Sequence, residues 1–199
     1  MKFISFKAIA SVFIAAAAIF SIATSTLAQE TPRVKFATTA GDFVVEVYPD
    51  KAPKTVANFL QYVNEKHYNG TIFHRVIENF MLQGGGFDAK YSQKPTRAPV
   101  AHEGREALAK GGAKNVVGTL AMARTNDPQS ATAQFFINVN DNAFLDPTPQ
   151  QFGYTVFGKV ISGMDVIQKI KTTPTGAGGP FPSDVPKTPI LINSATLVK

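Results

Sequence analysis

The fold is decided by the segment Phe73-His74-Arg75-Val76-Ile77-Glu78-Asn79-Phe80-Met81-Leu82-Gln83-Gly84-Gly85. Its apolar runs predict two short strands, 71–77 and 80–83, separated by the pair Glu78-Asn79. Strand alternation then places Arg75 on one face with Phe73 and Ile77. An arginine within an apolar strand is unusual. From the pattern alone, Arg75 fits a structural ion pair as well as it fits a functional hydrogen-bond donor.

A further strand, predicted over 134–139, is apolar on both of its faces. Alternation puts Phe136 on one face and Phe135 on the other. One face can fill the interior of a barrel, but the second must be covered or must form an apolar groove of the kind that binds ligands. Arg75 and Gln83 would be the polar groups in that groove.

The rest of the chain predicts many strands and only two helices. The strands are expected at 34–38, 43–48, 71–77, 80–83, 116–123, 134–139, 154–160 and 190–198. One helix is expected over 53–66, and another from Ser162, capped by Ser162 and Asp165, to Pro174. The segments 84–115 and 172–189 are expected to be loops. This pattern indicates a mainly β protein, a closed barrel or a sandwich.

The first 28 residues are not expected to belong to this domain. Lys2 and Lys7 precede an apolar run over 8–20, and small residues follow up to Ala28. This pattern is typical of a secretory signal peptide that is cleaved after Ala28. The alternative, a retained membrane anchor, is disfavoured because the run is shorter than the roughly 20 residues of a spanning helix. The predicted domains are a cleaved signal peptide, 1–28, and a mature domain, 29–199.

Composition excludes several classes of function. The net charge of +6 falls to +4 once Lys2 and Lys7 are removed, and the remaining basic residues rarely cluster, so nucleic acid is not a predicted partner. The 199 residues include no cysteine, which excludes disulfides, a thiol nucleophile and a thiolate metal site. A Gly-x-Ser-x-Gly elbow and metal-ligand spacing of histidines are also absent from the sequence. Neither a metal nor another cofactor is predicted.

Several ordered blocks resemble one family. The segment 73–85 closely resembles the signature of the cyclophilin-type peptidyl-prolyl cis-trans isomerases. Other blocks resemble that family at the expected spacing, namely 52–59, 118–124, 133–137, 144–146 and 152–160. The resemblance spans roughly residues 33–198. It implies a mainly β fold, a closed eight-stranded antiparallel barrel capped by two α-helices, with the active groove on the outside of the barrel.

The resemblance also implies roles for individual residues. The implied catalytic residues are Arg75, Gln83 and Phe80, with Arg75 as the catalytic arginine and Gln83 orienting the substrate. Within the groove, Phe80, Met81, Phe136 and Leu145 would form the proline pocket. The full set of implied substrate-binding residues is Met81, Ala123, Arg124, Gln134, Phe136, Phe144, Leu145 and Tyr154.

Two positions depart from the pattern of the best-known eukaryotic members. Phe144 stands where a tryptophan is common, and Tyr154 stands where a histidine is common. Because an indole N–H is missing, we expect weak cyclosporin binding. Catalysis should survive, since neither change touches Arg75.

The implied activity is cofactor-independent rotation about X–Pro bonds in proline-containing polypeptides. Arginine suits this task because it stays protonated and can donate to the prolyl nitrogen when the bond is twisted. An alternative is a chaperone module that grips proline segments with little turnover, in the same groove. The signal peptide and a resemblance to the bacterial periplasmic branch predict a periplasmic monomer without a stable membrane anchor, which assists the folding of exported proteins.

Overall fold

The computed structural model describes residues 31–198, so the predicted signal peptide lies outside the described residues. Eight antiparallel strands close into a barrel in the order β1-β10-β3-β4-β6-β5-β7-β2. The strands are β1 (Arg33–Thr38), β2 (Gly41–Val47), β3 (Thr71–Ile77), β4 (Met81–Asp88), β5 (Thr119–Met122), β6 (Phe135–Asn138), β7 (Val156–Ser162) and β10 (Leu191–Val198). The predicted eight-stranded barrel is confirmed.

Aromatic side chains fill the barrel interior. Phe36 and Phe43 stack with their ring centroids 4.9 Å apart, and Phe135 lies 5.5 Å from Phe36. All three side chains are buried, as is Phe73. Interiors packed in this way leave no room for a ligand, so a binding site must lie on the outer wall.

Two of the helices are those that the sequence predicts, α1 (Pro53–Asn64) and α3 (Met164–Lys171). A third, α2 (Gly104–Ala109), lies in the segment that was predicted to be a loop, as does much of β4. The predicted Ser162 cap is wrong, because Ser162 ends β7 and α3 follows Gly163, whose φ of 82° suits glycine. Among residues 31–198, no helix combines the length and apolar character that crossing a membrane requires.

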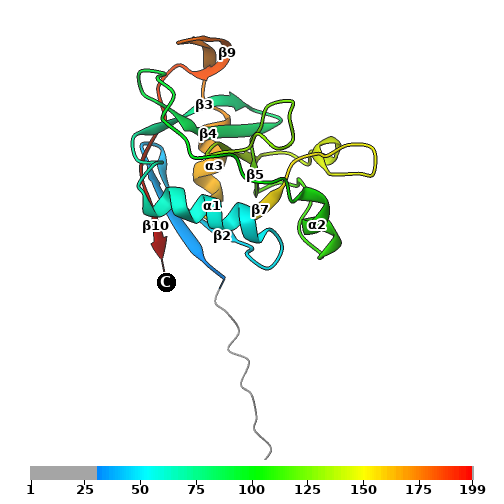
Figure 1. The fold of residues 1–199 in the computed structure, drawn as a ribbon. Helices are drawn as coiled ribbons and strands as arrows, with labels where there is room; N and C mark the ends of the chain where they lie inside the picture. The colour runs from blue at the N-terminus through cyan, green and yellow to red at the C-terminus, as the bar shows by residue number, and fades with distance from the viewer. Residues whose placement is uncertain (1–30, 199) are drawn as a thin grey trace, which may run out of the picture.

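The segment predicted as a proline-rich loop contains a second, two-stranded sheet. It consists of β8 (Thr175–Gly178) and β9 (Phe181–Pro186), and the resulting hairpin stands beside β3 at one edge of the barrel (Figure 1). The loop prediction fails because prolines are compatible with edge strands. Buried Val185 and the packing of Phe181 against Phe87 hold the hairpin on the barrel.

A β-bulge in β3 determines where Arg75 points. Phe73 pairs with Gly84 and Arg75 pairs with Gln83, so two steps along β3 match one step along β4. Phe73 therefore lies in the barrel core, whereas Arg75 is exposed on the outer wall. The predicted shared face of Phe73 and Arg75 is wrong, because simple alternation does not anticipate a bulge.

Candidate functional site

A recess of about 160 Å³ lies on the outer wall of the barrel, and most of the predicted site residues meet there. It is lined by Arg75, Phe80, Met81, Gln83, Ala123, Arg124, Phe136, Leu145 and Tyr154. Two of the predicted residues, Gln134 and Phe144, do not line it. The linings of this apolar recess and of the barrel core come from opposite faces of the same strands.

The floor of the recess is a second apolar cluster, separate from the barrel core. Met81 on β4, Phe136 on β6 and Leu145 are each less than a tenth exposed, and they pack with Ala121 of β5. The neighbouring Phe135 belongs to the barrel core, as strand alternation predicts. These strands therefore bury both of their faces, one in the core and the other in the recess.

Arg75 lies between this recess and a larger one of about 470 Å³. The two recesses share the side chains of Arg75, Gln83, Ala123 and Arg124. The Arg75 side chain is 44% exposed, and its Nε lies 3.6 Å from Oδ2 of Asp184 on β9. The guanidinium is thus at the edge of the apolar recess and is not enclosed in the protein interior.

Gln134 lines the larger recess, where it is joined to Gln83. Nε2 of Gln83 donates to Oε1 of Gln134 at 2.9 Å. Gly86 makes this possible, since a Cβ at that position would lie 2.5 Å from Cγ of Gln134. The two hydrogen-bonded amides therefore form part of the largely polar wall of the larger recess, next to Arg75.

Arg124 and Tyr154 form part of the wall of the smaller recess. The Arg124 guanidinium lies 4.5 Å from the centroid of the Tyr154 ring and donates twice to the carbonyl of Gly153. The Tyr154 ring in turn meets the Phe136 ring edge-on at 5.5 Å. These contacts hold the Arg124 side chain in a defined position at the wall of the recess.

Phe144 lies at the rim of the recess. Its ring stacks on Phe80 with centroids 5.6 Å apart, and it is 65% exposed. It follows Asn142 in a short 3-10 helix, Ala143–Leu145, which also carries Leu145 to the floor of the recess. Phe144 therefore extends the apolar surface beside Phe80 without lining the cavity itself.

A buried polar network behind the recess was not predicted from the sequence. Asn142 donates to the Phe80 carbonyl at 2.9 Å and to Asn138 at 2.7 Å. Asn115 donates to the Leu145 carbonyl at 3.2 Å and to Asp146 at 3.0 Å. In the sequence, Asn138 at the end of the apolar strand β6 indicates such a network, because a buried amide needs hydrogen-bond partners. The network holds the backbone that carries Phe80 and Leu145.

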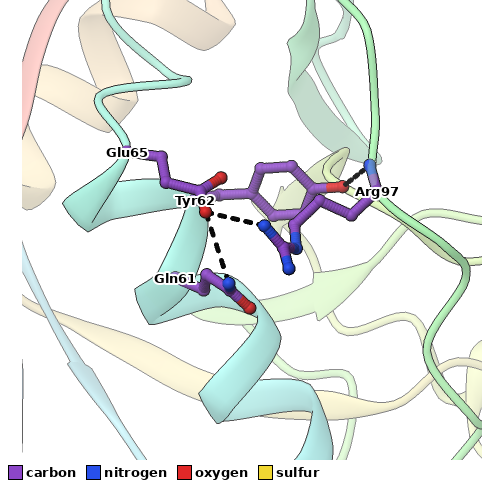
Figure 2. A network of polar contacts seen from close by, with 4 residues as sticks. All are labelled: Gln61, Tyr62, Glu65 and Arg97. Atoms are coloured by element: carbon purple, nitrogen blue, oxygen red, sulfur yellow. Dashed lines mark hydrogen bonds and ion pairs between the residues drawn. The ribbon is translucent and has the colours of Figure 1, made fainter.

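The segment between β4 and β5 closes one side of the larger recess through Gln93 and Thr96. Figure 2 shows how this segment is tied to α1. The backbone N–H of Arg97 donates to the Tyr62 hydroxyl at 2.7 Å, and its guanidinium pairs with Glu65 at 2.7 Å. The backbone next to Thr96 is thus anchored to a helix.

His74 follows Phe73 at the bulge and is 3% exposed. Its ring lies 4.8 Å from the Phe87 ring and 5.3 Å from the Phe181 ring. Burial, reinforced by the neighbouring positive charge of Arg75, lowers the pKa of His74 to about 4. The ring is therefore neutral near pH 7. No cluster of metal-ligating side chains occurs within 31–198.

Together the fold and the recess define a closed β-barrel with a recess of apolar floor on its outer wall, next to a half-exposed arginine side chain. Residues 33–197 match the family described as cyclophilin type peptidyl-prolyl cis-trans isomerase/CLD. The chain belongs to this family, and its enzyme class is accordingly that of the peptidyl-prolyl cis-trans isomerases.

Individual relatives agree with this assignment. The chain is 53% identical over 167 residues to peptidyl-prolyl cis-trans isomerase B of Escherichia coli, an alignment covering 82% of this chain and 98% of that protein. It is 51% identical over 164 residues to a peptidyl-prolyl cis-trans isomerase of Acinetobacter baylyi, covering 82% and 84% of the two chains.

Solved structures agree on the fold. The crystal structure of a cyclophilin type isomerase of Cryptosporidium parvum matches with a TM-score of 0.65 at 23% identity, covering 85% of this chain and 98% of that one. A second structure of that protein, in the presence of the dipeptide Ala-Pro, matches with a TM-score of 0.64 at 24% identity, covering 84% and 99%.

Proposed function

We propose that the proline ring of a substrate occupies the 160 Å³ recess and that Arg75 donates a hydrogen bond to the prolyl nitrogen as the X–Pro bond rotates. The supporting observation is the position of Arg75, at the edge of a cavity whose floor is Met81, Phe136 and Leu145. An apolar floor of this kind suits a ring without polar atoms. The substrate class is then proline-containing polypeptides.

The chemistry of the amide bond explains why a donor is enough. Resonance gives the bond a rotation barrier of about 18–20 kcal/mol. At the twisted geometry conjugation is broken, and the nitrogen regains a lone pair that can accept a hydrogen bond. A donor such as Arg75, fixed next to that nitrogen, stabilises the twisted state more than either planar state, which is the condition for catalysis. No covalent bond is made, so no nucleophile is required.

The apolar floor contributes in two ways. It anchors the ring while the preceding carbonyl turns, and it lowers the local dielectric around the hydrogen bond from Arg75, which strengthens that bond. The side chains of Gln83 and Gln134, which are hydrogen-bonded to each other beside Arg75, are placed to contact the substrate backbone. We assign Gln83 to orienting the substrate and the rest of the lining to binding it.

The central prediction is that Arg75→Ala abolishes most of the activity without unfolding the protein. Loss of one preorganised donor costs about 10²–10³ in rate, and the exposed Arg75 side chain is not part of the core. The measurement is the isomerisation rate of a short X–Pro peptide, with circular dichroism as the test of folding.

Arg105→Ala is the matched control, because Arg105 lies over Phe152 and lines neither recess. It should keep the wild-type rate. Near-normal turnover by a folded Arg75→Ala variant would refute the proposed role of Arg75. A variant that still binds proline peptides but no longer isomerises them would separate binding from catalysis.

We also propose that the enzyme is exported, loses residues 1–28 and acts in the periplasm as a monomer on exported polypeptides. The support is the sequence pattern of Lys2, Lys7 and the apolar run over 8–20, followed by Ala28. Expression of the full chain in a Gram-negative host followed by fractionation should yield a periplasmic protein that begins at Gln29 and elutes at monomer size. A cytoplasmic protein that retains Met1 would contradict export.

A further inference from the structure

The β8–β9 hairpin brings a carboxylate to the candidate catalytic arginine, and we propose that Asp184 is the positioning residue of the Arg75 guanidinium. Oδ2 of Asp184 lies 3.6 Å from Nε of Arg75. The inference rests on the proposed role of Arg75. Asp184 lies on β9, within the segment 172–189 that is predicted from the sequence to be a loop.

The ion pair, at 3.6 Å longer than a hydrogen bond, draws Nε of Arg75 towards Asp184 and so biases the orientation of the guanidinium without using its outer donors. Among residues 31–198, Asp184 is the one ion-pair partner of Arg75, and it is met through Nε. A guanidinium is planar, so a partner at Nε limits the orientation of both Nη groups. The Nη groups are then available to the prolyl nitrogen in the adjoining recess.

The hairpin that carries Asp184 is anchored to the barrel wall on which Arg75 stands. The Phe181 ring meets Phe87 edge-on at 5.1 Å, and the Tyr91 ring lies 6.3 Å away. Val185, next to Asp184, is 2% exposed. Because the hairpin is anchored, the Asp184 carboxylate has a defined position. A side chain that positions another one must meet this requirement.

The backbone of Asp184 is in a left-handed conformation, with a φ of 67°. This region is costly for most residues, but aspartate and asparagine tolerate it better than others do. The surroundings must therefore hold the backbone in place, and such backbone strain is found most often near functional sites. For the experiment it follows that Asp184→Asn removes the charge without adding backbone strain.

Because the Arg75–Asp184 pair is half-exposed, a positioning role in catalysis can be distinguished experimentally from a role in stability. The side chains of Arg75 and Asp184 are 44% and 34% exposed, and ion pairs in such positions contribute little to stability. Loss of the pair should therefore leave the unfolding midpoint unchanged. Its effect should appear in turnover, because a freely rotating guanidinium meets the twisted bond less often in the productive orientation.

The experiment measures kcat and KM of Asp184→Asn with an X–Pro peptide. We expect kcat to fall about three- to fivefold, as the modest energy of a half-exposed charge pair suggests, with KM within about twofold of the wild-type value. In an Arg75→Ala background, measured at raised enzyme concentration, Asp184→Asn should cause no further loss. Asp42→Asn is the matched control, because Asp42 also belongs to a half-exposed ion pair, with Lys35, but lines neither recess.

Three results would overturn the inference while leaving the proposed function intact. The first is an unchanged kcat in Asp184→Asn. The second is a rise in KM alone, which would mean that Asp184 contacts the substrate directly. The third is an equal loss with and without Arg75. An active wild type whose Arg75→Ala variant is also fully active would instead refute the proposed function, and with it this inference.

Discussion

A substitution at Phe144 is expected to change drug binding while leaving catalysis almost unchanged. Its ring stacks on Phe80 at the rim of the recess and has no hydrogen-bond donor. We predict that cyclosporin binds weakly and that Phe144→Trp, which supplies an indole N–H, tightens binding by several-fold to about tenfold, the value of one net hydrogen bond. Turnover should change by less than about twofold, because the substitution does not touch Arg75. Calorimetric titration and the peptide assay measure the two effects.

The control for this substitution is Phe152→Trp. Phe152 is another half-exposed phenylalanine, but it packs against His102 and Arg105 and does not line the recess. An indole at this position should leave cyclosporin affinity unchanged. Wild-type affinity already as high as that of Phe144→Trp would show that the missing donor is irrelevant.

Among the elements, α1 illustrates how a helix can be capped from a distant part of the chain. Its N-cap residue is Ala52, which has no polar side chain. Instead, the buried carboxylate of Glu103 accepts hydrogen bonds from the backbone N–H groups of Lys54 and Thr55, at 3.1 and 2.7 Å, and from the Thr55 hydroxyl at 2.8 Å. A negative charge at this end of a helix is favourable. Glu103 also joins the segment before α2 to α1.

We predict that Glu103→Ala lowers the free energy of unfolding by about 2–3 kcal/mol, because it leaves buried donors without an acceptor. Glu103→Gln should lose less, since its carbonyl oxygen can still accept. Urea unfolding provides the measurement, with the exposed Glu106→Ala in α2 as control. Equal stability of Glu103→Ala and the wild type would show that α1 does not depend on this cap.

The elements also show what the sequence can predict. Strands with strict alternation, such as the one that carries Phe135 and Phe136, are assigned to the correct faces because each residue has one inward or outward choice. Three features escape this rule. The bulge before Arg75 adds a residue to one strand, the hairpin of Asp184 contains the prolines that usually mark loops, and the cap of α1 comes from Glu103, which lies far away in the chain. All three depend on contacts between distant segments.

The molecule as a whole buries His67 and His74 and partly buries His102, and this should make its stability depend on pH. Burial lowers the pKa of His67, His74 and His102 in the folded state, and for His74 the value is about 4. Within the described part of the chain, Nδ1 of His74 has no hydrogen-bond partner. In the unfolded chain a histidine titrates near 6.5. Between about pH 6.5 and pH 4, the unfolded chain therefore binds protons that the folded protein does not.

The free energy of unfolding should therefore have its full value above about pH 6.5 and should decrease as the pH falls towards 4. His74 alone should account for up to about 3 kcal/mol of this decrease. His74→Phe keeps an aromatic ring between Phe87 and Phe181 but cannot be protonated. Urea unfolding at pH 7.5 and pH 4.5 should therefore show a smaller loss in this variant than in the wild type. Contributions of carboxylates and of the other histidines are common to both proteins and cancel in the comparison. If both proteins lose the same free energy, the His74 ring takes up its proton as easily in the folded state as in the unfolded one.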